Sequence, residues 1–192
     1  MQNIPVLKRF DVETPLGVVH LVCFNKAGVN HREVIFGVLS EVSGRTVTSA
    51  NLIENEENPK PTFPCLGFDV NWTHSGDICV LAYGDSGLRV GVDYEIHKAR
   101  RLKIADHFFN PDEVTCIKSL SPDAAEREFF RLWCRKEALY KCVGGSFFEG
   151  ALRRSMLDSR LLLEDGRLVY FCDVAEPVGE TVASLCVVVS LG

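Results

Sequence analysis

Two carboxylates lie two residues apart in a segment whose pattern predicts a β-strand. Residues 88–95 alternate in character, with apolar side chains on one side and Asp93 and Glu95 on the other. Because successive side chains of a strand point to opposite faces, the two carboxylates are expected to share one face. Neighbouring carboxylates repel each other unless a cation lies between them, and Mg²⁺ is a hard cation that suits their oxygens. The pattern predicts a metal site, with a solvated strand face as the alternative.

A second group of charges interrupts the apolar stripe of a predicted helix over 123–142. At about 100° per residue, the aromatic side chains fall in one arc, and Glu137 falls inside it, flanked by Lys136 and Lys141. Arg135 falls on the opposite side and is expected in solvent. Burying an unpaired charge is costly, so these charges need partners or a ligand. Glu137 and Lys141 could form a solvated i, i+4 pair, or Glu137 could bind a metal or a proton while the lysines face an anion.

Three further polar features could bind anions. His74 stands between two hydroxyl residues at the end of a predicted strand, where it could donate hydrogen bonds, although a satisfied turn histidine is the simpler interpretation. Lys60 lies between two prolines in a predicted loop over 51–64, either presented to a phosphate or as an ordinary surface lysine. The basic run 97–103 follows the carboxylate strand, as a solvated helix face or a docking patch for an acidic partner.

Both strands and helices are predicted to position these residues. Alternating or continuously apolar runs predict strands, and apolar spacing of three and four predicts helices. The first predicted helix has Asn30 as its N-cap, and the turn 84–87 could be a hinge between two halves. The sequence predicts an α+β fold, with strands at 18–23, 68–72, 78–83, 88–95, 167–174 and 181–190 and helices at 31–42, 96–106, 111–119 and 123–142.

Composition narrows the classes of protein that remain. The 192 residues are 46% hydrophobic and 24% charged, which excludes intrinsic disorder and a coiled-coil rod. The net charge of −5 argues against nucleic acid as a partner. Eight cysteines without a Cys-x-x-Cys pair predict reduced, mostly buried thiols rather than a zinc site. No apolar run suits a signal peptide or a membrane span, so we expect a cytoplasmic protein without membrane contact.

The order of these motifs resembles that of the Sfp-type 4′-phosphopantetheinyl transferases. The family's S-H-S, G-V-D-x-E, F-(S/A)-x-x-E and W-x-x-K-E-A-x-x-K patterns correspond to Thr73–Ser75, Gly91–Glu95, Phe109–Glu113 and Trp133–Lys141. Two upstream matches are weaker: Pro59–Pro61 resembles a G-K-P loop, and His31–Arg32 opens a helix where the family has an arginine. The chain departs from the family with Pro59 in place of the loop glycine and with Thr73 in place of the first serine.

The resemblance implies a fold and an activity. The fold would be a pseudodimer of two similar α+β halves, acting as a monomer with its active site in the cleft between them. Residues 1–86 would take the adenosine end of coenzyme A, and residues 87–192 would carry the metal and the catalytic residues. The activity would be transfer of the 4′-phosphopantetheine arm of coenzyme A to a serine of an apo carrier protein, with release of 3′,5′-adenosine bisphosphate.

The resemblance also implies a role for each site residue. Mg²⁺ would be bound by Asp93, Glu95 and Glu137. Glu137 and Lys141 would be the catalytic residues, with Glu137 taking the serine proton or acting only as a ligand. Coenzyme A would be bound by two groups of residues: Lys136 and Lys141 at the pyrophosphate, and Arg32, Lys60, Thr73 and His74 toward the adenosine end.

Two other functions are compatible with the same residues. A Mg²⁺-dependent nuclease or phosphohydrolase also uses carboxylates and a lysine, but Glu137 and Lys141 lie four apart on a predicted helix rather than two apart on a strand. A non-catalytic carrier-protein binding module would have a decayed site, which the intact charged residues argue against. The class of carrier, whether acyl, polyketide or peptidyl, is left open.

Overall fold

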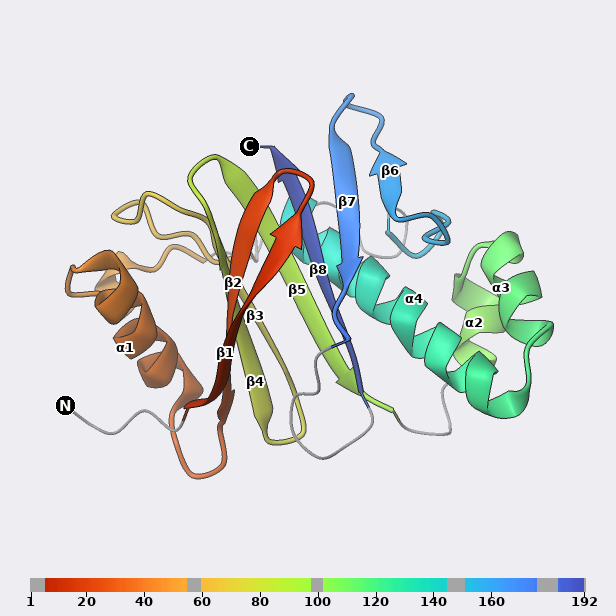
Figure 1. The fold of residues 1–192 in the computed structure, drawn as a ribbon, viewed down its shortest axis with the longest axis horizontal. Coiled ribbons are helices and arrows are strands. Elements are labelled where there is room, and N and C mark those ends of the chain that lie inside the picture. The colour runs from red at the N-terminus through yellow and green to blue at the C-terminus, as the bar shows by residue number, and fades with distance from the viewer. Residues whose placement is uncertain (1–5, 55–59, 98–101, 145–150, 176–182, 192) are drawn as a thin grey trace.

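Two antiparallel sheets form the centre of the molecule (Figure 1). The computed structural model describes residues 6–54, 60–97, 102–144, 151–175 and 183–191. The first sheet has the order β1-β2-β4-β3, with β1 at Val6–Thr14, β2 at Gly17–Asn25, β3 at Val70–Ser75 and β4 at Ile78–Gly84. The second has the order β5-β8-β7-β6, with β5 at Leu88–Ile96, β6 at Arg160–Leu162, β7 at Leu168–Asp173 and β8 at Ala183–Leu191.

Side-chain caps mark the start of two of the described helices. Asn30 accepts a hydrogen bond from the Arg32 backbone N–H at 3.1 Å, which confirms it as the N-cap of the first helix. Asn110 and Glu113 form a capping box before a helix that opens on proline. The helices of the described residues are α1 (His31–Ser43), the 3₁₀ turn η1 (Ser49–Asn51), α2 (Leu102–Phe108), α3 (Pro111–Lys118) and α4 (Pro122–Val143).

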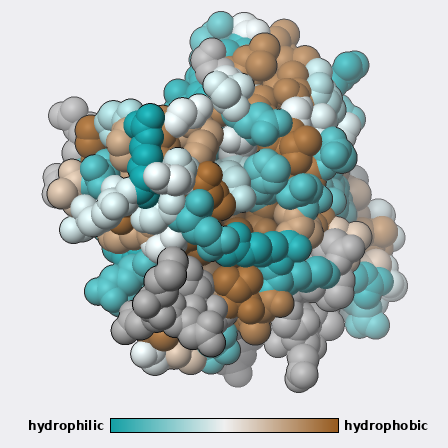
Figure 2. All heavy atoms as spheres, turned by 60° about the vertical axis from the view of Figure 1, so that its left-hand side comes forward, coloured by the Kyte–Doolittle hydropathy of each residue, from teal (hydrophilic) through white to brown (hydrophobic). Residues whose placement is uncertain are grey.

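The elements stack in four layers, with an apolar cluster at each of the three contacts between them. In Figure 1, α1 covers the outer face of the first sheet and α4 the outer face of the second. The cluster between the sheets is built from the inward face of each strand, and its buried members are Val19, Leu21, Cys23, Val80, Ala82, Leu88, Val90, Val92, Tyr94, Leu185, Val187 and Val189. The face that carries α1 shows a band of hydrophilic side chains between apolar patches (Figure 2).

The two sheets repeat one arrangement of elements. In each, a strand is followed by a helix and then by two strands that pair, and the last strand lies between the other two. The matching sets are β2-α1-β3-β4 and β5-α4-β7-β8, with β1 and β6 added at the outer edges. The predicted α+β fold of two similar halves is confirmed by this repetition. The strands of the two sheets come from residues 6–84 and 88–191, and the domain boundary between 86 and 87 stays a prediction.

Some elements differ from the sequence prediction. The first strand, β1, was not predicted because half of its side chains are polar, as suits an edge strand with one open face. The predicted loop 51–64 contains a β-bridge between Ile53 and Thr62. The helix predicted over 96–106 begins at Leu102, and residues 98–101 of the basic run lie outside the described residues. All eight cysteines are free thiols. No helix of the described chain is long and apolar enough to cross a bilayer.

Candidate active site

The helix α4 lies directly across β5 because a glycine leaves room for it. A Cβ at Gly91 would lie 2.1 Å from the Ala138 carbonyl oxygen and 2.6 Å from the Cys142 nitrogen, closer than real contacts allow. The face of β5 that the alternation assigns to polar residues is therefore covered, and Asp93 is only 3% exposed. This packing brings the charged residues of α4 to the carboxylates of β5.

Asp93 is held by a lysine and a hydroxyl. Its Oδ1 accepts from Lys141 Nζ at 2.6 Å and from Thr73 Oγ1 at 3.0 Å, and Lys141 also contacts Thr73 at 3.2 Å. The second oxygen, Oδ2, is buried with no hydrogen-bond partner in the described part of the chain. Buried carboxylate oxygens rarely stay without a partner, so Oδ2 marks a place where a ligand would be stabilised.

Lys141 stays charged in this setting. Burial by itself lowers the pKa of a lysine, but the charge of Asp93, its hydrogen bond and the charge of Glu137 outweigh burial and raise the pKa of Lys141 above its usual value. The ammonium group therefore neutralises Asp93 in this structure. The charge of Glu137 is among the influences that raise the pKa of Lys141, so the two predicted catalytic residues interact electrostatically.

The edge strands β3 and β5 are joined through side chains. The Asp69 carboxylate accepts from the Val90 N–H at 2.8 Å, and the Asn71 amide oxygen accepts from the Val92 N–H at 3.1 Å. Ser75 accepts from the Ile96 N–H at 3.2 Å and donates to Glu95 Oε2 at 3.0 Å. These contacts satisfy backbone donors of β5 and set Thr73 opposite Asp93. Sequence reasoning missed this set, although polar residues at every second position from 69 to 75 were a signal for it.

The carboxylates suit a divalent cation in their chemistry. The unpartnered Asp93 Oδ2 and the same-face Glu95 are hard oxygen donors of the kind that Mg²⁺ prefers. Within the described residues, however, no group of three or more His, Cys, Asp and Glu side chains is arranged so that it could hold a metal ion. The trio of Asp93, Glu95 and Glu137 therefore stays a prediction.

Lys136 does not face an anion site in this structure. Its side chain is fully buried, and Nζ pairs with Glu113 at 2.7 Å and donates to the Arg154 and Leu152 carbonyls at 2.6 and 3.0 Å. Burial lowers the pKa of Lys136, and Glu113 opposes that effect. The predicted contact with pyrophosphate is not supported, because Glu113 and the Arg154 and Leu152 carbonyls hold Nζ inside the protein. Glu113 also accepts from the Met156 N–H at 2.7 Å, so the pair joins α3, α4 and the segment before β6.

The prediction that Arg135 points to solvent was wrong. Its side chain is buried, with Nε and Nη2 on the Asp173 carboxylate at 2.9 and 2.6 Å. Nη1 donates to the Met156 and Asp158 carbonyls at 2.7 and 2.8 Å. The helical wheel placed Arg135 opposite the aromatic arc, but β7 and the segment before β6 cover that side of α4.

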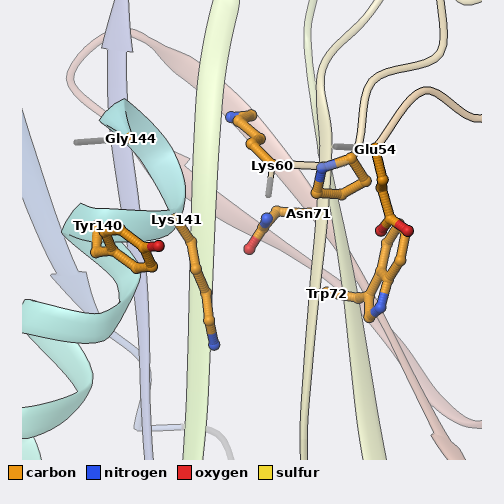
Figure 3. A pocket seen from close by; sticks show the side chains of 8 residues that line it. Glu54, Lys60, Asn71, Trp72, Tyr140, Lys141 and Gly144 are labelled. Atoms are coloured by element: carbon orange, nitrogen blue, oxygen red, sulfur yellow. The ribbon is translucent and has the colours of Figure 1, made fainter. Parts of the chain in front are cut away.

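A pocket of about 200 Å³ opens between α4 and β3 (Figure 3). Lys141 and Tyr140 come from α4 on one side, Trp72 and Glu54 lie on the other, and Lys60 and Asn71 lie between them. The residues that line the pocket are Glu54, Lys60, Pro61, Asn71, Trp72, Tyr140, Lys141 and Gly144. The lysine ammonium on one wall and the aromatic rings give the pocket surfaces for an anion and for an apolar group.

The predicted coenzyme A ligands Arg32 and His74 are not among the residues that line this pocket. Arg32 is exposed and pairs at 2.9 Å with Glu54, a residue of the pocket wall. His74 is exposed on the face of β3 opposite Thr73, with its ring 5.8 Å from that of His31. Burial, then the charges of His74 and Arg32, lower the pKa of His31. The structure therefore brings Thr73 to Asp93 and sets His74 at the start of α1.

The motif-bearing half of the chain matches a known family. Residues 89–166, which contain β5 and α2 to α4, match the ACPS model of the 4′-phosphopantetheinyl transferase superfamily. This part of the chain is similar to that superfamily. The match covers the carboxylate strand and the helix that delivers Lys141, and it ends before β7 and β8 of the second sheet.

Curated proteins of the superfamily are similar over part of their length. The 4′-phosphopantetheinyl transferase psf-1 of Bacillus pumilus is 38% identical over 117 residues, which are 60% of this chain and 48% of that protein. The 4′-phosphopantetheinyl transferase AcpT of Escherichia coli K12 is 35% identical over 96 residues, which are 48% of this chain and 49% of that protein. The chain therefore spans about half the length of these relatives.

Proposed function

We propose that this protein transfers the 4′-phosphopantetheine arm of coenzyme A to a serine of an apo carrier protein. The observation that carries the proposal is the meeting of Lys141, Asp93 and Thr73 at the crossing of α4 and β5, inside the region that matches the superfamily. The names of the relatives support the same transfer. The eight free thiols support a location in the reducing cytoplasm.

The reaction is a single displacement at the β-phosphorus of coenzyme A. The serine oxygen forms a bond to this phosphorus, and the bond to the oxygen that bridges the two phosphates breaks. The products are the phosphopantetheinyl serine and 3′,5′-adenosine bisphosphate. Glu137 takes the serine proton, and the Lys141 ammonium offsets charge on the pyrophosphate oxygens as the leaving group departs.

We propose Mg²⁺ as the metal, held by Asp93, Glu95 and Glu137. A bound divalent cation supplies charge neutralisation at the pyrophosphate. Thr73 and Ser75 hold the orientation of Asp93 and Glu95, since each hydroxyl donates to one carboxylate. Arg32 and His74 are proposed for the adenosine end with its 3′-phosphate, because both are exposed cationic or titratable groups near α1.

Intact-mass spectrometry of apo carrier proteins tests the transfer. Apo acyl, polyketide and peptidyl carriers are each incubated with this protein, coenzyme A and Mg²⁺, beside Glu137→Ala and EDTA controls. We expect a mass gain of one phosphopantetheine arm on at least one carrier, lost in both controls. No gain on any carrier, together with no binding of coenzyme A, would contradict the proposal.

A further inference from the structure

The buried Lys60 ammonium touches both elements that carry the site. Its Nζ donates to the Val90 carbonyl of β5 at 2.7 Å and to the Cys142 carbonyl of α4 at 3.4 Å, and it forms an ion pair with Asp69. The side chain is only 4% exposed. We propose that Lys60 is a positioning residue, which holds α4 against β5 so that Lys141 reaches Asp93, and that it does not bind a phosphate of coenzyme A.

The contact with the Cys142 carbonyl lies at the C-terminal end of α4, where the last carbonyls need hydrogen-bond donors. The last four carbonyls of a helix have no partner within the helix, and its C-terminus carries a partial negative charge. The Gly144 N–H satisfies the Tyr140 carbonyl at 2.8 Å, and Lys60 supplies a cation at Cys142 from outside the helix. Because Cys142 directly follows Lys141, a shift of this turn moves the lysine that holds Asp93.

Asp69 and Lys60 together bind the backbone of Val90. Asp69 neutralises Lys60, and its carboxylate also accepts from the Val90 N–H at 2.8 Å. Both polar groups of the Val90 backbone are therefore bound by this pair. The Lys60 ammonium is held within this set of contacts, although the residue lines the pocket of Figure 3 together with Lys141.

The proposal rests on the proposed function only for its kinetic consequence. Lys60→Met removes the ammonium and keeps the stem, and Asp69→Asn removes the opposing charge. If Lys60 positions α4, both variants lower kcat for carrier modification by about tenfold or more, because misplaced groups lose rate rather than binding. Their Kd for coenzyme A, measured by calorimetry, changes by less than about threefold. The double variant is no worse than the single variants, since the pair acts as a unit.

A direct phosphate contact would give the opposite pattern. Lys60→Met would then weaken the Kd for coenzyme A by more than about tenfold, and Asp69→Asn, by releasing the ammonium, would leave that Kd unchanged or tighten it. A Kd weakened by more than about tenfold in Lys60→Met, or a Kd tightened by more than about threefold in Asp69→Asn, overturns the proposal. Lys118→Met is the matched control, because Lys118 pairs with Asp106 on the surface far from any site described above. It should change neither kcat nor Kd.

Hydrogen exchange tests the positioning without any turnover. We expect the amides of the last turn of α4, residues 140–144, to exchange about tenfold faster in Lys60→Met than in the native protein, while α1 is unchanged. If Lys60→Met alone does not fold, Lys60→Met/Asp69→Asn is measured instead, because it leaves no unpaired buried charge. Unchanged exchange at 140–144 overturns the proposal, whether or not the protein modifies a carrier. A native protein without transferase activity would overturn only the proposed function.

Discussion

Lys141 neutralises the charge of Asp93, because its ammonium forms an ion pair with that buried carboxylate. We expect Lys141→Met to lower kcat for carrier modification by about 100-fold, as loss of one group that stabilises developing charge does in other sites. The same change leaves Asp93 without its ion-pair partner and lowers the free energy of unfolding by about 1–3 kcal/mol, since the pair is partly exposed.

Carrier modification and urea unfolding measure the two effects of Lys141→Met. Lys118→Met again serves as the control, because its pair is exposed and contributes little. A variant with native kcat would show that Lys141 does not act on the reacting groups. A variant with native stability but low kcat would assign Lys141 to the reaction alone.

For Lys136 we expect a large effect on stability and no effect on coenzyme A binding. Its pair with Glu113 is fully buried on both sides, so Lys136→Met leaves an uncompensated carboxylate and should lower the free energy of unfolding by about 3–5 kcal/mol. Lys136→Met/Glu113→Gln should recover much of this loss, because it removes both charges and keeps an amide oxygen that can accept from the Met156 N–H. Under conditions where the double variant folds, its Kd for coenzyme A should match the native value. A large loss of coenzyme A binding in the folded double variant would restore Lys136 as a ligand.

At the scale of elements, the contact of α4 with β5 depends on one missing side chain. Gly91→Ala places a Cβ against the Ala138 carbonyl and the Cys142 backbone, so α4 must move away from β5. We expect a loss of about 1–3 kcal/mol or more in the free energy of unfolding and a kcat reduced with it, as Lys141 moves from Asp93. Gly67→Ala is the control, since its Cβ would meet nothing within 4 Å.

Unfolding and carrier modification are measured for both glycine variants. Gly91→Ala with native stability and native kcat would contradict the argument that this glycine sets the spacing of α4 and β5. A stable variant with low kcat would place the effect in the position of Lys141 rather than in packing.

The elements themselves could be predicted because local patterns encode them. The alternation of residues 88–95 and the cap at Asn30 act over a few residues, and the structure has β5 and α1 there. The partners of the charged residues could not be predicted in the same way. A helical wheel shows that Lys136 flanks an aromatic arc, but not that Glu113 of another helix fills the space before it. Lys60 and Asp69 likewise meet β5 and α4 only in the folded chain.

At the scale of the whole molecule, thiols buried in the apolar clusters make the free energy of unfolding depend on pH in the alkaline range. Burial raises the pKa of the Cys23 and Cys79 thiols to about 12, although Lys8 and Lys26 act in the other direction. The ordinary pKa of a cysteine thiol is 9.0, so the unfolded chain releases these protons first. The stability from the two protonated thiols is therefore fully present below pH 9.0 and is lost as the pH rises toward about 12.

Urea unfolding under reducing conditions, at a series of pH values from about 8 to 10.5, measures this loss. We expect the free energy of unfolding to fall across the upper part of the series. The fall should be shallower in Cys23→Ala/Cys79→Ala, because that variant keeps the tyrosines and lysines that also titrate there but lacks the two thiols. Equal slopes in the two proteins would show that the thiols ionise as readily in the folded chain as in the unfolded one. In that case, a reagent that reacts only with thiolates should modify Cys23 and Cys79 in the folded native protein near pH 9.0. The burial of Cys23 and Cys79 predicts instead that both stay unmodified until the chain unfolds.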